Sequence, residues 1–332
     1  MTEAAVQAGH ARWRAMLGTT AGGNAQSPAM GGLDARRALQ LGLAGIWLLD
    51  GVLQYQPFMY TKAFGQTLAG TAPGNPAVIA RPITWQAGLV EHHLVLLNTI
   101  YATIQLLIGL GIAIRPTARL ALGGSIAWSL GVWWFGEGLG GVLNGRASPL
   151  NGAPGGVILY ALLAVLLWPA DRGMPAPFPA ARAVGAHVAR ALWLVLWLSL
   201  AYFALTPANR APGAVSGLIA GMTDGEPPWL SALMNGAASL VTGEGLATSI
   251  VLAAALVVIA AGVCLPAPAA KGTLLLAVMV SLVIWVFAEA LGAILAGGAT
   301  DPNSGPLLIL LALAYWPAGP VQQGTVQQPV TS

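Results

Sequence analysis

The chain has 332 residues, of which 56% are hydrophobic and 8% are charged, and its formal net charge is +3. Soluble domains carry roughly 25% charged residues, so this composition excludes a water-soluble domain and gives no basis for a nucleic-acid surface. It predicts an all-α integral membrane protein. The single cysteine, Cys264, excludes an internal disulfide, and its apolar neighbours predict a buried thiol.

From the N-terminus, residues 1–37 contain four arginines and no apolar core, which predicts a cytoplasmic tail rather than a signal peptide. Eight apolar segments follow, each near the ~20 residues that cross a bilayer core. They are residues 38–56, 90–114, 118–142, 153–170, 187–206, 246–268, 272–296 and 304–319. The fourth and the eighth are short, which indicates tilt or shielding by neighbours. Residues 320–332 form a polar end that we predict to be disordered.

A thirteen-residue pattern occurs once in the third apolar segment and again in the seventh. Residues 133–145 read WWFGEGLGGVLNG and residues 285–297 read WVFAEALGAILAG, with seven identical positions. The outer-loop sequences LAGTAPGNP and IAGMTDGEP also match, and both copies finish on Trp-Pro. The pattern predicts a tandem duplication of a four-helix unit, with membrane repeats at residues 38–170 and 187–319 and a cytoplasmic linker at residues 171–186.

The Lys and Arg residues favour one orientation of these segments. With the N-terminus inside, ten of them fall on inner segments and four on outer ones. Segments rich in Lys and Arg tend to stay in the cytoplasm, so we predict a plasma (inner) membrane protein with both termini cytoplasmic and with parallel repeats. The outer segments 57–89 and 207–245 contain amphipathic runs that we expect to lie at the membrane interface and to cover a pocket.

Ionisable residues gather at one depth on the outer side of this arrangement. Asp50, Glu91 and Glu137 belong to the first repeat. Glu289 repeats Glu137 in the second, and Asp301 lies in the next outer turn. Acids within a membrane are costly unless they pair or face water, so they are candidates for function. One reading makes Glu137 and Glu289 proton acceptors or substrate contacts. The other makes them packing residues that bond to Trp or backbone N–H groups across a helix interface.

The run Glu91-His92-His93 opens the second predicted span. Adjacent residues on a helix point about 100° apart, so this run by itself is a poor set of metal ligands. A metal would need Asp50 or Glu137 from neighbouring helices, and the predicted site contains no metal. An interfacial proton relay and a hydrogen-bonded helix start are the two other readings.

The chain contains twelve tryptophans, many of them near predicted helix ends. The aromatic belt at the membrane interface accounts for that placement. Trp133, Trp134 and Trp285 lie next to the paired acids, so they are also candidate contacts for a planar cofactor such as a quinone ring. A belt or packing role is the simpler reading.

Sequence motifs of soluble enzymes are absent, but one membrane family has similar features. No phosphate-binding loop, dinucleotide fingerprint, paired CxxC, haem-attachment motif or serine nucleophile elbow occurs. The third predicted helix ends in Phe-Gly-Glu-Gly-Leu-Gly-Gly, and Pro154-Gly155-Gly156 precedes the fourth. With the long outer segment after the first helix, these features resemble the DoxX/DoxD-like membrane family over residues 37–170 and 187–319. The resemblance implies a membrane subunit associated with thiosulfate:quinone oxidoreductases.

The function implied by this resemblance is oxidation of a small outer-side reductant such as thiosulfate, coupled to reduction of a quinone in the bilayer, with a redox partner subunit. Glu137 and Glu289 would relay protons. The residues that would orient or extend this relay are Asp50, Glu91, His92 and His93. Two alternatives use the same acids, a non-enzymatic permease and a structural or assembly subunit of a membrane complex. Against the permease, the sequence reveals no clearly broken helix at matching positions.

Overall fold

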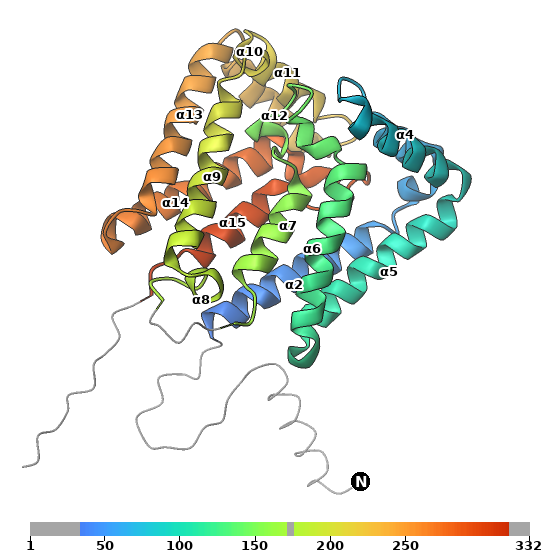
Figure 1. Cartoon of the computed structure of the whole chain (residues 1–332). Helices are drawn as coiled ribbons and strands as arrows, with labels where there is room; N and C mark the ends of the chain where they lie inside the picture. The colour runs from blue at the N-terminus through green and yellow to red at the C-terminus, as the bar shows by residue number, and fades with distance from the viewer. Residues whose placement is uncertain (1–33, 171–175, 319–332) are drawn as a thin grey trace, which may run out of the picture.

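The computed structural model describes residues 34–170 and 176–318, and every regular element within them is a helix (Figure 1). The all-α prediction is therefore confirmed for these residues, while most of both predicted tails lies outside them. The helices of the first half are α2 (Ala35–Leu53), α3 (Lys62–Ala69), α4 (Ala77–His92), α5 (Leu94–Ala113), α6 (Ala118–Phe135) and α7 (Gly156–Leu166).

The second half has a similar order of elements, with the short helices α8 (Ala181–Val184) and α10 (Pro207–Arg210) in addition. Its other helices are α9 (Ala186–Ala204), α11 (Ala214–Gly221), α12 (Pro228–Leu240), α13 (Gly245–Gly262), α14 (Ala267–Val283) and α15 (Ser304–Ala314). Helices α2 and α9 each have 19 residues, and α7 and α15 each have 11. In the first half α2 packs on α5 and α6 packs on α7, and in the second half α9 packs on α13 and α14 on α15.

Four of the described helices are long and apolar enough to cross a membrane. They are Leu94–Ala113, Ala186–Ala204, Gly245–Gly262 and Ala267–Ala288, the last being α14 with the π-helical turn that follows it. Large apolar side chains such as Val195 and Val251 are exposed on them, as suits contact with lipid. Cys264, at the end of α13, is exposed, so the prediction of a buried thiol is wrong. It lies at the turn between α13 and α14, where the apolar neighbours in sequence do not cover it.

The second predicted span begins later than its apolar pattern indicates. Glu91 and His92 end α4, and α5 begins at Leu94. His93 joins the two helices with φ −132° and ψ 40°, so the chain turns there rather than continuing as one helix. Apolar residues flank the run Glu91-His92-His93 on both sides, at Leu89-Val90 and from Leu94 onward, so hydropathy averaged over a window places the run inside the span. Glu91 and His92 therefore do not belong to the span to which the sequence assigns them.

The short helices α7 and α15 lie together at the centre of the molecule (Figure 1). Most of their residues are buried, and Leu163 and Leu307 are fully so. An 11-residue helix is about 16 Å long, roughly half the ~30 Å of a bilayer core. The predicted shielding by neighbours agrees with this burial. Each N-terminus thus starts deep inside the bundle rather than at its edge.

Both long helices that precede these short ones end in a left-handed turn. After α6, residues Gly138–Gly141 all have positive φ, between 56° and 72°. After α14, Ala290–Ala293 also have positive φ, between 48° and 77°. Only glycine adopts this conformation without cost, which explains why the motif is rich in Gly. The turn reverses the chain direction at matching positions, so the expectation of unbroken helices is wrong.

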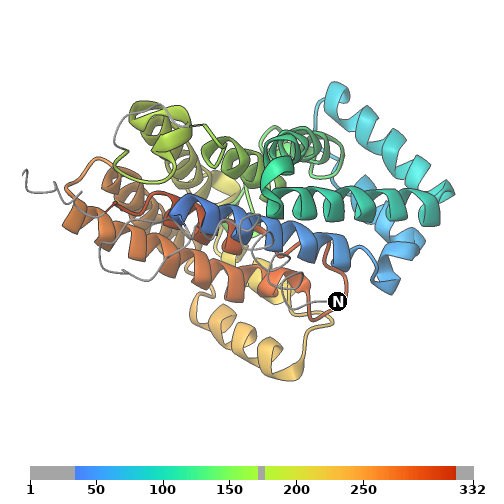
Figure 2. The same cartoon turned by 90° about the horizontal axis from the view of Figure 1, so that it is seen from below.

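The outer segments form helical hairpins outside the central bundle. Helices α3 and α4 pack on each other, as do α11 and α12. In the view of Figure 2, α4 and α12 project from different sides of the molecule. Trp85 of α4 is 67% exposed and Trp229 of α12 is 60% exposed. These faces agree with the predicted amphipathic runs, because exposed Trp is typical of helices at a membrane interface.

Candidate functional site

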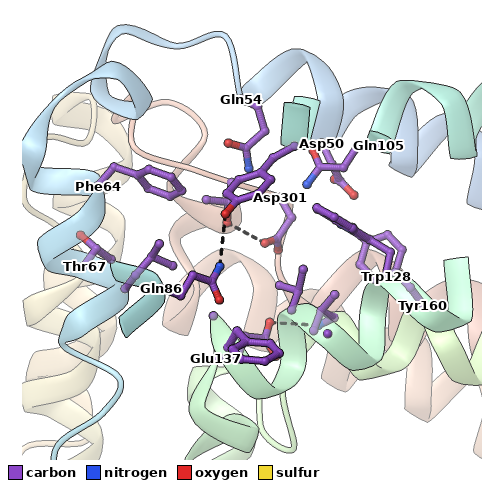
Figure 3. Close-up of a pocket in the computed structure, with 18 of the residues that line it drawn as sticks. Asp50, Gln54, Phe64, Thr67, Gln86, Gln105, Trp128, Glu137, Tyr160 and Asp301 are labelled. Atoms are coloured by element: carbon purple, nitrogen blue, oxygen red, sulfur yellow. Dashed lines mark hydrogen bonds between the residues drawn. The ribbon is translucent and has the colours of Figure 1, made fainter. Parts of the chain in front are cut away.

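One cavity, lined mostly by the first half and closed by residues 298–301 of the second, contains several of the predicted site residues, and we call it the chamber. Its volume is about 370 Å³, within the size range of small-molecule sites. Its aromatic lining is Trp47, Phe58, Phe64, Tyr101, Trp128, Phe135 and Tyr160. Its polar side chains include three glutamines, Gln54, Gln86 and Gln105 (Figure 3). The chamber combines flat apolar walls with a few convergent polar groups, as ligand sites do.

Three carboxylic acids line the chamber, and its lining residues include no Lys, Arg or His. Asp50 comes from α2, Glu137 from the end of α6 and Asp301 from the loop before α15. Asp50 is 1% exposed, and its Oδ1 has no hydrogen-bond partner among the described residues. Figure 3 shows Asp50, Asp301 and Glu137 around one space. Burial raises the pKa of the loop residue Asp301 above its ordinary value.

A second cavity adjoins the chamber, and we call it the polar cavity. Its volume is about 450 Å³. Polar side chains of Asn144, Arg146, Asn151 and Asn303 line it. The backbone of both left-handed turns lines it too. The two cavities share six lining residues, which are Thr71, Gly136, Glu137, Gly298, Thr300 and Asp301. Glu137 and Asp301 therefore lie at the junction of an apolar space and a polar one.

Glu137 lies where α6 ends and is directed at the first turn of α7. Its backbone N–H donates to the Val132 carbonyl five residues back, which widens the last turn of α6. One carboxyl oxygen, Oε1, accepts a hydrogen bond of 3.0 Å from the N–H of Val157. A carboxylate at a helix N-terminus is favoured by the helix dipole and satisfies an otherwise free N–H group. The other oxygen, Oε2, is buried without a partner among the described residues.

Glu289 occupies the matching place at α15, but both of its oxygens are bonded. Its backbone N–H also donates five residues back, to the Ile284 carbonyl. Oε1 accepts from the hydroxyl of Ser304, and Oε2 accepts from the N–H of Gly305 at 3.1 Å. Its side chain is 1% exposed, and it lines neither the chamber nor the polar cavity. These contacts match the packing interpretation of the paired acids, in which the carboxylate bonds to backbone across a helix interface.

Trp133 and Trp285 make one hydrogen bond each, and the two bonds match. The indole of Trp133 donates to the Pro154 carbonyl at 2.6 Å, and that of Trp285 donates to the Pro302 carbonyl at 2.9 Å. Each bond fixes the loop just before α7 or α15. Neither indole lines the chamber, and Trp134 is 38% exposed. The rings that face the chamber are instead Trp47 and Trp128.

Glu91, His92 and His93 lie away from the chamber lining. The Nδ1 atom of His92 is 2.6 Å from the Gly88 carbonyl one turn earlier. The Glu91 side chain packs against Gly65 of α3. Within the residues that the structure describes, no three His, Cys, Asp or Glu side chains gather as metal ligands. These contacts are those of a helix end, which is one of the three interpretations of the run.

Several residues that line the chamber were not identified by the search for acids within apolar segments. Gln54 and Gln105 are polar residues in or next to predicted spans, and both are mostly buried. Polar side chains inside apolar segments are themselves a marker for a site, so this signal was present in the sequence. Trp47, Trp128 and Tyr160 have no such marker, because only the packing of α2, α6 and α7 brings their rings together.

Comparisons of the chain with protein-family models, with curated proteins and with solved structures found no match.

Proposed function

We propose that the chain is an eight-span membrane protein built from two parallel four-helix units, with both termini cytoplasmic, and that its chamber binds a quinone. The recurring order of helices and the matching turns after α6 and α14 support the duplication. The observation that carries the function is the chamber itself, in which aromatic rings surround three acids. Such a membrane-embedded site belongs with DoxX/DoxD-like quinone-linked oxidoreductase subunits.

The chemistry of the lining suits a quinone ring. The rings of Trp47 and Trp128 offer flat apolar surfaces on which a planar ring stacks. The amides of Gln54 and Gln105 can donate hydrogen bonds to the two ring carbonyls. Reduction of a quinone to a quinol takes up two electrons and two protons. The carboxyl groups of Asp50 and Glu137 supply groups that can deliver those protons.

The electron donor in this proposal is a small outer-side reductant such as thiosulfate. Two thiosulfate ions lose one electron each and form one sulfur–sulfur bond, giving tetrathionate, while the quinone takes both electrons and two protons. The chamber has three acids and no basic residue in its lining, so a dianion is disfavoured there. The reductant therefore reacts outside the chamber, on a redox partner subunit whose own redox centre would pass the two electrons to the quinone.

Quinone reduction by the purified chain in liposomes tests this function. The assay supplies thiosulfate outside and a short-chain quinone in the bilayer, and compares Glu137→Gln with the matched variant Glu289→Gln. We expect Glu137→Gln to lower turnover by roughly 100-fold, as loss of a general acid does. Glu289→Gln, in protein that stays folded, is expected to keep most of the turnover. The proposal is contradicted if folded wild-type protein reduces no quinone with any of the donors, either alone or together with its membrane partners.

A proton-coupled permease is the second candidate, and one observation favours it. The half-length helices α7 and α15 start at matching deep positions after the two left-handed turns. Interrupted helices that meet inside a repeat protein are typical of transporters. Uptake of small solutes into the same liposomes, driven by an imposed pH gradient, distinguishes the candidates. Solute uptake without quinone reduction favours the permease, and an inert folded protein favours a structural subunit.

A further inference from the structure

The sequences at the starts of α7 and α15 differ at the residue that lies next to Glu137 in the first half and next to Glu289 in the second. The first half reads Pro154-Gly155-Gly156-Val157, and the second reads Pro302-Asn303-Ser304-Gly305. Both prolines accept the Trp hydrogen bond, and Val157 and Gly305 both donate to the acid. Gly156 therefore stands where the second half has Ser304.

Because of this difference, Glu289 has one more hydrogen-bond donor than Glu137. The Ser304 hydroxyl donates to Glu289, and with the Gly305 N–H it uses both carboxyl oxygens. Gly156 has no side chain to donate, so the nearby Oε1 of Glu137 accepts only from the Val157 N–H, and the other oxygen, Oε2, is buried beside Gly155 without a partner. A buried acceptor without a partner is destabilising, so the first half has a costly arrangement that is absent at Glu289.

Residues near the two acids also differ in polarity between the halves. Counted from the starts of α2 and α9, Asp50 corresponds to Ala201. Counted from the starts of α5 and α13, Gln105 corresponds to Leu256. In the second half these positions are buried apolar side chains, with Ala201 5% and Leu256 0% exposed. At these two positions the second half thus has buried apolar side chains where the first half has polar residues that line the chamber.

We propose that Glu137 is the carboxyl through which protons pass from the polar cavity into the chamber, that Gly156 keeps it able to do so, and that Glu289 is a structural cap for α15. Glu137 lines both cavities, and Glu289 lines neither. The other ionisable groups around the route are Asp50, Tyr101 and Tyr160 in the chamber, Arg146 in the polar cavity, and Asp301, which lines both. The route serves the proposed quinone chemistry, but its geometry does not depend on which ligand occupies the chamber.

Gly156 also allows a matched pair of variants. A Cβ at this position would lie 3.6 Å from Glu137 Oε1 and 3.6 Å from Asn303 Oδ1, which is ordinary contact. A serine there places a hydroxyl within reach of the Glu137 carboxyl, as Ser304 does for Glu289. An alanine adds the same Cβ without a donor. Any difference between Gly156→Ser and Gly156→Ala therefore reports the hydrogen bond rather than the added volume.

Labelling by dicyclohexylcarbodiimide, read by mass spectrometry of the peptides, tests the proposal in the full chain. This apolar reagent adds to protonated carboxyl groups in membranes. We expect label on Glu137 and none on Glu289 in the wild type. Gly156→Ser is expected to lower labelling of Glu137 by about tenfold, because a donated hydrogen bond stabilises the carboxylate relative to the protonated form with which the reagent reacts. Gly156→Ala is expected to stay close to the wild type.

Three results overturn the proposal: equal labelling of Glu137 and Glu289, no label on Glu137, or the same labelling in Gly156→Ser and Gly156→Ala. Thermal unfolding of each variant in detergent identifies any that are misfolded, and for those Ser304→Gly gives the reciprocal test, since it should make Glu289 newly reactive. If the labelling is as expected but no quinone is reduced, the proposed proton route stands and the proposed quinone function is wrong. Turnover that survives in a folded, unlabelled Gly156→Ser protein removes the route and keeps the function.

Discussion

Glu137 and Glu289 sit in the same thirteen-residue motif and at the same bend of the chain, but their surroundings differ. Glu289 is fully bonded and sealed from both cavities, whereas Glu137 has one unpartnered oxygen and lies at their junction. The motif residues do not account for this difference. Residues outside the motif, Gly156 in the first half and Ser304 in the second, contribute to it. A repeated acid is therefore evidence for a repeated bend, and its chemistry depends on what the next helix presents to it.

The left-handed turns differ between the halves as well. The turn at Gly138–Gly141 contains one residue with a side chain, Leu139, whereas the turn at Ala290–Ala293 contains three. A left-handed residue other than glycine costs roughly 1–2 kcal/mol. The second half thus has more backbone strain in its turn, but both carboxyl oxygens of its acid accept hydrogen bonds. The first half has less strain in its turn and one carboxyl oxygen without a partner. Four substitutions separate these contributions.

The largest effect is expected for Gly140→Ala. A Cβ at Gly140 would overlap the Pro154 carbonyl oxygen, which is backbone and cannot move aside without shifting the loop before α7. We expect the free energy of unfolding to fall by at least about 3 kcal/mol, because a clash is added to a positive φ of 62°. Denaturant unfolding in detergent measures it. Gly272→Ala, in α14 with open space around it, is the control and should change stability by less than about 1 kcal/mol.

The next effect concerns the structural acid. Glu289→Ala removes the acceptor of both the Ser304 hydroxyl and the Gly305 N–H and leaves two buried donors unpaired. We expect a loss of about 2–4 kcal/mol in unfolding free energy. Glu137→Ala, which frees only the Val157 N–H, should cost about half as much. Equal losses in the two variants, measured by thermal unfolding in the same detergent, would contradict this and show that the two carboxyl groups contribute equally to stability.

A smaller effect, of opposite sign, is expected in the chamber. Asp50 is a buried acid with an unpartnered oxygen, and its counterpart in the second half is Ala201. Asp50→Ala should therefore raise the unfolding free energy by about 1–2 kcal/mol while weakening quinone binding, since residues kept for function often cost stability. Unfolding and quinone titration of one preparation give both values. A destabilised Asp50→Ala protein would assign Asp50 to the packing of α2.

The smallest effect is expected for Ala293→Gly, which gives the second turn the glycine that the first has at Gly141. Ala293 has φ 56°, so glycine relieves strain at this position, offset in part by the entropy that glycine loses on folding. We expect a gain of about 0.5–1 kcal/mol in unfolding free energy. Gly141→Ala should lose a similar amount. If Ala293→Gly lowers stability, the turn is not strained at that residue.

Sequence reasoning recovers the helical class, the approximate positions of the apolar segments and the acids that meet at the chamber. Asp50 and Glu137 were identifiable because charges in apolar segments are rare, and both line the chamber. Gln54 and Gln105 carried the same signal more weakly. The break at His93 was hidden because apolar residues flank the short run Glu91-His92-His93 on both sides. Hydropathy does not depend on backbone conformation, so the sequence indicated the left-handed turns only through its high glycine content.

The roles of the aromatic residues were the hardest to predict. Trp133 and Trp285 flank the acids in sequence, yet their indoles bond to Pro carbonyls. Trp128 lies further from Glu137 in sequence and lines the chamber. Three helices have to be packed before the rings that share a space are known, and a linear pattern does not contain that packing. The same limit applies to Gly156, whose meaning depends on the carboxyl that it faces.

Photolabelling with an azido-quinone in liposomes tests most directly whether the molecule has one ligand chamber and whether it lies in the first half. The labelled residues are found by mass spectrometry, with excess unlabelled quinone as the competition control. The account predicts competed label on the peptides of α5 and α6 that contain Tyr101, Gln105 and Trp128, with none at the matching peptides of α13 and α14. Competed label at those second-half peptides, or label confined to lipid-facing residues such as Leu107 and Leu120, would contradict it.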